Sequence, residues 1–339
     1  MELNKGMNLG GFLSQCCHEE THYASFIQEQ DIRQIAAWGF DHVRLPIDYE
    51  IFETLEGEII ERGFQRVHQV VRWCINSNLN IILDLHKAYG YDFNDAGNSK
   101  KNSLFQSDVL MFRFIRLWSR IVEQFGNYRN VAFELLNEVV EKENAKGWNK
   151  LIKMTLSEIR KVNASAPVIY GGIQWNSVKT LKYLDKPQDE NVIFTFHFYE
   201  PLLFTHQKAP WVAAMNPEET VVYPESMEYY WLRSGKLGFQ GEVVTLAKSQ
   251  TMGEEFITEM IQEAVDASDK AGVSLYCGEF GVIDRAPVED TLRWFVDVNR
   301  VFKKNHIGFA VWTYKKMDFG IIEEHYAPIK DDLIRLWRD

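Results

Sequence analysis

The chain has 339 residues, of which 46% are hydrophobic and 25% are charged, a composition typical of a soluble globular protein. Its formal net charge of −11 at pH 7 disfavours nucleic acids and anionic membranes as partners, because both repel a negative surface. Aromatic residues make up 14% of the chain, and either a packed core or a binding cleft lined with flat rings would account for them. The length fits one large α/β barrel or two ordinary domains.

The cysteines and the N-terminus bear on the compartment. Cys16, Cys17, Cys74 and Cys277 lack the spacing of a metal or redox motif, so we interpret all four as free thiols. Residues 1–11 lack the apolar core of a signal peptide, and the longest apolar runs are far shorter than a membrane span. The sequence as given predicts a cytoplasmic protein, or an extracellular one if it is exported by another route or a leader is missing.

Apolar runs of strand length alternate with segments of helical periodicity along the whole chain. Eight of these runs predict strands, at 7–9, 42–46, 81–86, 131–138, 167–172, 192–199, 275–280 and 308–314. Such alternation favours parallel pairing, and eight units predict a single (β/α)8 TIM barrel that takes up residues 1–339. The competing fold, an open doubly wound sheet, is disfavoured by the eight repeats and by the lack of a dinucleotide-binding glycine motif.

One interval, between the sixth and seventh predicted strands, is longer than a single βα unit requires. Residues 200–253 hold most of the excess, with four prolines among many aromatic residues, and this composition is too apolar for a disordered linker. We therefore predict a small, ordered insertion subdomain between the sixth strand and the sixth helix. It should pack over one side of the barrel mouth without forming a separate domain.

Polar and aromatic side chains gather at the predicted C-terminal ends of the strands, where barrel enzymes hold their active sites. These ends carry Arg44, His86, Asn137, Glu138, His197, Tyr199, Glu279 and Trp312. Glu138 and Glu279 each follow an apolar stretch and lie where a strand should open into the mouth. We interpret these two glutamates as a functional pair.

Some of these side chains also have a structural interpretation. Arg44 is either part of a buried ion pair, for which Asp84 and Glu134 are the obvious partners, or a clamp on a carboxylate of the site. Glu134 lies four residues before the end of its predicted strand, about 13 Å down the barrel, so we interpret it as structural. His86 has the alternative of being a satisfied core histidine, and Trp312 that of closing the barrel top.

Together the segments resemble the motif set of family 5 glycoside hydrolases. The matching segments are VRLP with Arg44, LDLH with His86, FELLNE with Asn137 and Glu138, HFY with His197 and Tyr199, GEFG with Glu279, and VWTY with Trp312. The resemblance covers essentially the whole barrel in the right order, and it is strongest to the clostridial endoglucanase C type. One departure is Lys87, which follows His86 where relatives often place a second histidine.

The resemblance implies retaining hydrolysis of a β-glycosidic bond, with Glu138 as the acid/base and Glu279 as the nucleophile. It implies that Arg44 and Tyr199 keep the nucleophile ionised and that Asn137 contacts the 2-hydroxyl group of the sugar. The remaining implied roles are hydroxyl or carboxylate contacts for His86 and His197 and a flat floor under the sugar for Trp312. Further subsite candidates, with packing as the alternative, are Trp175 and Trp211 and, less specifically, Tyr89, Phe93 and Phe204.

The first substrate hypothesis is an endo-acting β-1,4-glucanase that acts as a monomer, without a metal or cofactor, on β-glucan polysaccharides or oligosaccharides, including mixed-linkage glucan. The same mechanism on mannan, glucomannan or xyloglucan stays open, as does an exo-acting β-glucosidase on oligosaccharides. A non-catalytic carbohydrate-binding barrel is disfavoured because both carboxylates are present. An enzyme for phosphorylated substrates is disfavoured because the loops after the last two strands are not rich in glycine.

Overall fold

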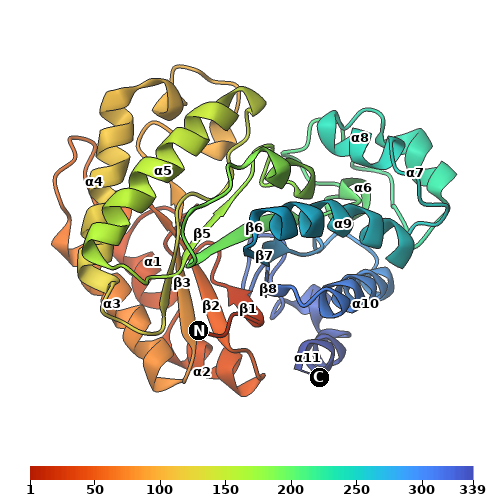
Figure 1. The fold of residues 1–339 in the computed structure, drawn as a ribbon. Helices are drawn as coiled ribbons and strands as arrows, with labels where there is room; N and C mark the ends of the chain where they lie inside the picture. The colour runs from red at the N-terminus through yellow and green to blue at the C-terminus, as the bar shows by residue number, and fades with distance from the viewer. Residues whose placement is uncertain (339) are drawn as a thin grey trace.

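The computed structural model describes residues 1–338, in which parallel strands close into a barrel in chain order (Figure 1). The strands are β1 (Lys5–Asn8), β2 (His42–Asp48), β3 (Asn80–Lys87), β4 (Val131–Glu134), β5 (Val168–Gly171), β6 (Val192–Phe198), β7 (Ser274–Phe280) and β8 (Gly308–Val311). Because β1 pairs with both β2 and β8, the sheet has no free edge. The predicted (β/α)8 barrel is confirmed.

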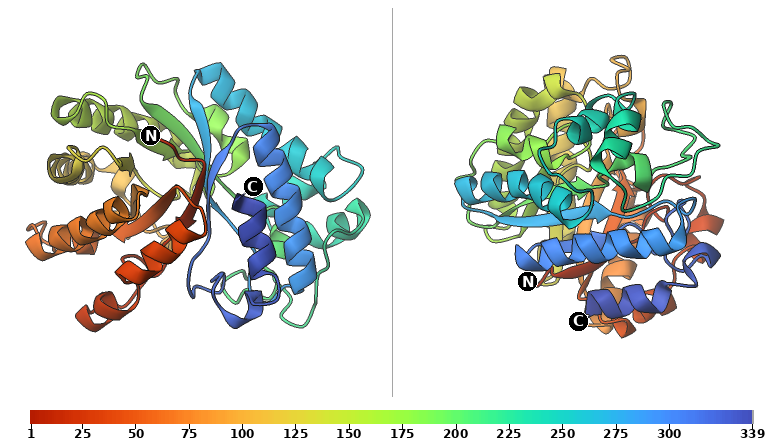
Figure 2. Two further views of the ribbon diagram at one scale, coloured as in Figure 1. Left: turned by 90° about the horizontal axis from the view of Figure 1, so that it is seen from below. Right: turned by 90° about the vertical axis from the view of Figure 1, so that its right-hand side faces the viewer.

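Helices surround the barrel on the outside (Figures 1 and 2). They are α1 (Glu20–Ser25), α2 (Glu29–Ala37), α3 (Glu61–Asn76), α4 (Asp108–Phe125), α5 (Ala145–Val162), α9 (Glu254–Ala271), α10 (Val288–Lys304) and α11 (Lys330–Arg338). A 3-10 helix, η5 (Val178–Tyr183), lies between β5 and β6. Among residues 1–338, none of the helices is long and apolar enough to cross a membrane.

Two strands end well before their predicted bounds. The sequence predicts strands over 131–138 and 308–314, but β4 ends at Glu134 and β8 at Val311. Beyond these points hydrogen bonds still anchor the chain to neighbouring strands, among them those from the Asn137 amide to Leu85 O at 3.1 Å and from the Trp312 amide to Phe280 O at 2.9 Å. The side chains at these two strand ends therefore stand on short, anchored extensions of the sheet.

Three fully buried tryptophans of the outer helices hold the ends of β4, β5 and β6. The indole nitrogen of Trp118 on α4 donates to Leu135 O at 3.0 Å, and that of Trp148 on α5 donates to Gly171 O at 2.9 Å. Trp294 on α10 donates in the same way to a carbonyl just after β6, at 3.0 Å. A buried indole needs such a partner, so each tryptophan packs a helix and fixes the backbone beside the barrel mouth.

Residues 200–253 contain the helices α6 (Leu202–Thr205), α7 (Met227–Ser234) and α8 (Phe239–Thr245). Figure 1 shows α7 and α8 side by side, at the opposite end of the molecule from α4 and α5. Tyr223 is buried between this segment and α10, where its amide donates to Asp290 at 3.0 Å and its hydroxyl to Asp297 at 2.9 Å. The segment is thus ordered and fastened to the barrel.

The first and last elements of the chain, β1 and α11, lie on the same side of the molecule (Figure 1). Lys5 Nζ on β1 donates to the backbone oxygen of Arg338 on α11, and α11 packs against α10 through Trp337 and Phe295, whose ring centroids are 5.3 Å apart. All four cysteines are free thiols.

Candidate active site

The strand ends open into a cleft of about 740 Å³. The residues predicted at the strand ends line it, except Arg44, and so do the two tryptophans predicted for subsites: His86, Asn137, Glu138, Trp175, His197, Tyr199, Trp211, Glu279 and Trp312. Parallel strands of a closed barrel point their carboxyl ends to one mouth, which is why residues from distant parts of the sequence meet there.

Arg44, on β2, lies fully buried under the cleft and bonds to acids on three other strands. Its Nε and Nη2 atoms donate to both oxygens of Glu134, at 2.7 and 3.0 Å, and Nη2 lies 3.0 Å from Asp84 Oδ2. Nη1 donates to Glu279 Oε1 at 2.7 Å. Burial alone would lower the pKa of Arg44, but the three carboxylates raise it well above its usual value. Arg44 thus forms the structural ion pairs and also contacts a site carboxylate.

Asn8, at the end of β1, belongs to the same network and was missed in the sequence. Its Oδ1 atom accepts a hydrogen bond from Arg44 Nη1 at 3.0 Å, and its Nδ2 atom donates to Gly278 O at 2.9 Å. Asn137 Oδ1 accepts from Arg44 Nη2 at 2.9 Å. The available signal for Asn8 was its place as the one polar residue of the first predicted strand, 7–9.

Glu279 accepts hydrogen bonds on both carboxylate oxygens. Besides Arg44 Nη1 on Oε1, the Tyr199 hydroxyl donates to Oε2 at 3.0 Å, and His197 Nδ1 lies 3.5 Å from Oε2. Burial, followed by the nearby negative charge of Glu279, raises the pKa of Tyr199 well above its usual value. Tyr199 therefore stays a neutral donor, and the donors around Glu279 stabilise its negative charge.

Glu138 is in a different environment. Burial raises the pKa of its carboxyl group to about 7, so that it keeps a proton to higher pH than an ordinary glutamate. His197 Nδ1 lies 2.8 Å from Glu138 Oε1, and burial lowers the pKa of this histidine to about 4, so its ring is neutral at pH 7. The site thus pairs a carboxyl group that holds its proton with a charge-stabilised carboxylate.

The two carboxyl groups are close together. A carboxylate oxygen of Glu138, one of Glu279 and a ring nitrogen of His197 all lie within 4.8 Å of one another. These three atoms are also near enough to ligate a metal ion, but Arg44 and Tyr199 already donate to the two oxygens of Glu279. A positive guanidinium bonded directly to the carboxylate opposes a second cation there.

His86 and Trp312 line the cleft as a stacked pair of rings. Their rings are parallel within 3°, with centroids 5.9 Å apart. Nδ1 of His86 lies 2.7 Å from Asp84 Oδ2, and Nε2 lies 3.1 Å from the side-chain amide of Gln15. Because Asp84 accepts from Nδ1–H, Nε2 is left as the acceptor for Gln15, which defines the tautomer.

Trp175 and Trp211 line the cleft with side chains that are 36% and 54% exposed. Trp175 lies in the turn 174–176, whose three residues all have positive φ, between 51° and 57°. Non-glycine residues seldom adopt this conformation, and strained turns of this kind concentrate at functional sites. Both rings are available to a ligand, unlike the tryptophans that pack the barrel.

The other aromatic candidates differ in position. Phe93 lines the cleft and meets His86 edge to face, with ring centroids 5.2 Å apart. Phe204 is fully buried in the core. Tyr89 lies outside the cleft lining, and the guanidinium carbon of Arg113 lies over its ring, 3.6 Å from the centroid of the Tyr89 ring. Lys87 is paired with Asp92 at 2.9 Å. Cleft residues that were not predicted from the sequence include Gln15, Glu200, His206 and Asp318.

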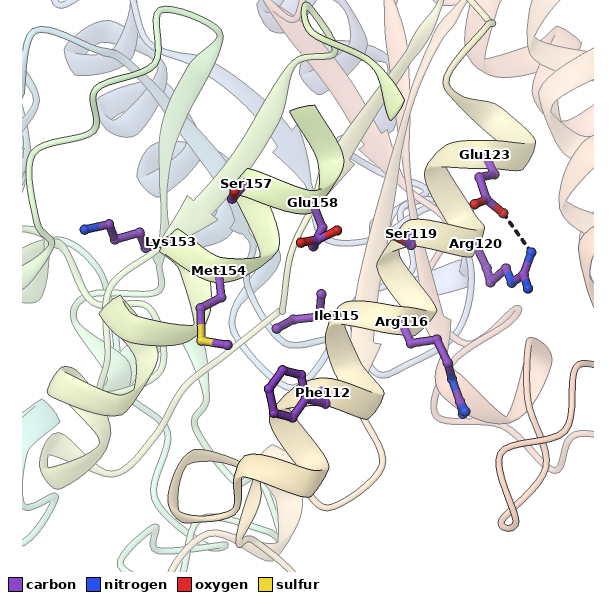
Figure 3. A pocket seen from close by; sticks show the side chains of 10 residues that line it. All are labelled: Phe112, Ile115, Arg116, Ser119, Arg120, Glu123, Lys153, Met154, Ser157 and Glu158. Carbon is purple, nitrogen blue, oxygen red and sulfur yellow. Dashed lines mark hydrogen bonds and ion pairs between the residues drawn. The ribbon is translucent and has the colours of Figure 1, made fainter. Parts of the chain in front are cut away.

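A second hollow, of about 640 Å³, lies on the outside of the barrel between α4 and α5 (Figure 3). Phe112 and Ile115 of α4 and Met154 of α5 point into it, and Arg120 pairs with Glu123 at its edge. It lies on the helical surface and contains none of the residues at the strand ends, so we do not assign the chemistry to it.

A (β/α)8 barrel with two carboxyl groups this close at the strand ends has the architecture of a glycoside hydrolase. Comparison with known families agrees: residues 4–318 match the model described as Cellulase (glycosyl hydrolase family 5). The chain belongs to this family, as the motifs predicted, and it is a glycoside hydrolase.

The chain is similar to characterised relatives over nearly its whole length. It is 38% identical to Endoglucanase C of Acetivibrio thermocellus, over 98% of this chain and 96% of that one. It is 37% identical to Cellodextrinase A of Ruminococcus flavefaciens, over 89% of this chain and 83% of that one. A solved hyperthermophilic endo-β-1,4-glucanase in complex with substrate matches with a TM-score of 0.75 at 25% identity, over 95% of this chain and 92% of that one.

Proposed function

We propose that the protein is an endo-β-1,4-glucanase that hydrolyses β-glucan with retention of anomeric configuration. The observation that carries this proposal is the pair Glu138 and Glu279, whose nearest oxygens lie within 4.8 Å of each other. Burial favours the protonated form of Glu138, whereas Arg44 and Tyr199 donate hydrogen bonds to Glu279. Retaining enzymes need carboxyl groups about 5–5.5 Å apart, one as acid/base and one as nucleophile. The similarity to Endoglucanase C over 98% of the chain supports the choice of β-glucan.

In the first step, Glu279 attacks the anomeric carbon while Glu138 gives its proton to the glycosidic oxygen. The bond to the leaving sugar breaks as the bond from Glu279 Oε to carbon forms. In the second step, Glu138, now ionised, takes a proton from water, and the water oxygen displaces Glu279 from the sugar. Each step inverts the anomeric centre, so the product keeps the configuration of the substrate.

The surrounding residues have defined parts in these steps. Asn137 uses its Oδ1 atom for Arg44, which leaves its Nδ2 group to donate to the 2-hydroxyl of the sugar, where hydrogen bonds strengthen in the transition state. Neutral His197 orients Glu138. Tyr199 keeps its donor on the nucleophile, and Trp312 offers its ring face to the sugar.

A second candidate is the hydrolysis of short β-glucan oligosaccharides rather than polymer. Two observations favour it: the similarity to Cellodextrinase A, and residues 211–213, 239 and 240 of the insertion, which line one side of the cleft. The mechanism is the same in both candidates, so only the length of the preferred chain differs.

The test is reducing-sugar release from carboxymethylcellulose, barley β-glucan, glucomannan and xylan, with Glu279→Gln as the control. We expect the parent to cleave the glucans, with viscosity falling early in the reaction, and the folded variant to be inactive. Activity confined to cellodextrins would favour the second candidate. Silence of a folded parent on polymers and oligosaccharides alike would contradict both.

A further inference from the structure

A third buried glutamate lies beside the pair that we assign to catalysis. Glu200 follows Tyr199 at the end of β6, is 8% exposed and lines the cleft. The Tyr199 amide donates to Glu200 Oε2 at 3.0 Å, and the Trp294 indole donates to the Glu200 backbone oxygen at 3.0 Å. The backbone and the carboxyl group are therefore both held in place, although the mechanism above gives Glu200 no part.

The protein supplies no counter-charge to this carboxyl group. Within residues 1–338, no lysine, arginine or histidine forms an ion pair with Glu200, and Lys179 acts on it only from a distance. By contrast, the more deeply buried Glu53 pairs with Arg113 at 2.6 Å. Burial raises the pKa of Glu200 to about 7. An unpaired buried carboxyl group is costly, and in a cleft it marks a functional candidate.

The position of Glu200 decides which part of a substrate it can meet. The proton donor Glu138 follows β4, and a proton donor faces the leaving group. Trp175 follows β5, and both Glu200 and Trp211 follow β6. The arc from β4 to β6 is therefore the leaving-group half of the mouth, and the loops after β8, β1 and β3 form the opposite half.

We propose that Glu200 is a specificity-determining residue of the leaving-group half, where it accepts hydrogen bonds from hydroxyl groups of the first sugar beyond the scissile bond. This inference rests on the proposed function. A fixed carboxyl group beside exposed rings at Trp175 and Trp211 combines an apolar wall with a few placed polar groups, which is typical of ligand sites. Sugar hydroxyl groups would donate to the Glu200 carboxyl group the hydrogen bonds that no side chain among residues 1–338 donates to it.

The test isolates the leaving-group half. An aryl β-cellobioside forms the glycosyl-enzyme, and methyl β-cellobioside is added as an acceptor that competes with water. The ratio of transfer to hydrolysis is measured against acceptor concentration for the parent, Glu200→Ala and Glu200→Gln. Because both products come from one intermediate, a general loss of rate cancels from the ratio.

Asp290→Asn is the control. Asp290 on α10 is also 8% exposed and accepts a backbone amide hydrogen bond, from Tyr223 at 3.0 Å, but unlike Glu200 it pairs with Arg293, and it lies outside the cleft lining. This variant controls for the removal of a buried charge elsewhere in the barrel. Glu200→Gln, which keeps the shape and one acceptor, serves as the test if Glu200→Ala does not fold.

We expect Glu200→Ala to raise the acceptor concentration for half-maximal transfer about tenfold, the loss typical of one hydrogen bond to a charged group. Glu200→Gln should raise it less, and Asp290→Asn should match the parent. An unchanged ratio in both Glu200 variants, or an equal change in the control, would overturn the inference. If the folded parent does not cleave the aryl cellobioside at all, it is the proposed function that fails.

Discussion

Arg44 is one buried cation bonded to Asp84, Glu134 and Glu279, so its loss should affect both folding and catalysis. Arg44→Met leaves the three carboxyl groups without their counter-charge, and breaking a buried pair in this way costs about 3–5 kcal/mol. Urea denaturation measures the change in the free energy of unfolding.

The control for Arg44 is Arg33→Met, which removes an exposed ion pair to Glu29 at 2.8 Å. An exposed helical pair of this kind contributes about 0.3–0.5 kcal/mol. Equal, small losses for the two variants would mean that Arg44 is not the electrostatic centre of the barrel.

If Glu138 is the acid, as we propose, its titration should determine the alkaline side of the pH profile. Its pKa is raised to about 7, so the group is protonated below that pH and loses its proton above it. As the acid must be protonated for the first step, kcat/KM on cellodextrins should fall as the pH rises through about 7. An aryl cellobioside with a good leaving group needs no proton, and its kcat/KM should lack this fall. An identical alkaline fall with both substrates would contradict the role of Glu138.

At the scale of elements, a bulge in β7 aims the proposed nucleophile. Phe196 pairs with Cys277 and the next residue of β6, His197, pairs with Glu279, so Gly278 is an extra residue between them. A β-bulge redirects the side chain that follows it. This one sets Glu279 opposite His197, the neighbour of Glu138.

Gly278→Ala tests the bulge. An added Cβ would lie 2.9 Å from Thr195 Oγ1 and 3.2 Å from His197 Nε2, so the methyl group displaces the Thr195 hydroxyl and shifts His197 by a fraction of an ångström. A misplacement of 1 Å at a catalytic group costs about 100-fold in rate, so for this smaller shift we expect kcat on β-glucan to fall by less, about tenfold.

Gly235→Ala is the control for the bulge, because a Cβ there meets nothing within 4 Å and its φ of −58° suits alanine. Equal kcat values for Gly278→Ala, Gly235→Ala and the parent would show that the bulge does not set the geometry.

Local pattern predicted the elements, but not their irregularities. The alternating apolar runs located all eight strands. A bulge adds one residue without changing the composition of a strand. The extra residue at Gly278 therefore cannot be recognised from the pattern of apolar residues in the sequence. The early ends of β4 and β8 could not be predicted either. The residues just after Glu134 and Val311 are still apolar, and the chain there is still hydrogen-bonded to neighbouring strands.

At the scale of the whole molecule, barrel closure explains which site residues could be predicted. Glu138 and Glu279 stand out in the sequence because each ends an apolar run, and the fold then sends both ends to one mouth. Asn8 and Glu200 do not stand out. Asn8 has a role only because it bonds to Arg44 on the neighbouring strand. In the sequence, Glu200 resembles an ordinary acidic loop residue, and only the folded structure, with the insertion and α10 packed beside it, shows that it is buried.

The charge of the cleft predicts a salt effect on anionic substrates. Among the residues from 1 to 338 that line it are the acids Glu279 and Asp318, with no lysine or arginine. Glu138 and Glu200, whose pKa values are raised to about 7, add negative charge as the pH rises through that value, and the chain carries a net charge of −11. Raising NaCl from about 10 to about 150 mM screens this repulsion. We expect kcat/KM to rise on carboxymethylcellulose and to stay constant on neutral barley β-glucan. A fall on carboxymethylcellulose would contradict an anionic cleft.

The most direct test of double displacement is to trap the intermediate. An activated 2-deoxy-2-fluoro-β-cellobioside slows the second step, and mass spectrometry of the intact protein and its peptides then locates the sugar. We expect one added fluorocellobiosyl group, attached to Glu279, and a β-configured first product by NMR. A label on another residue, or an α-configured product without any covalent intermediate, would contradict double displacement through Glu279.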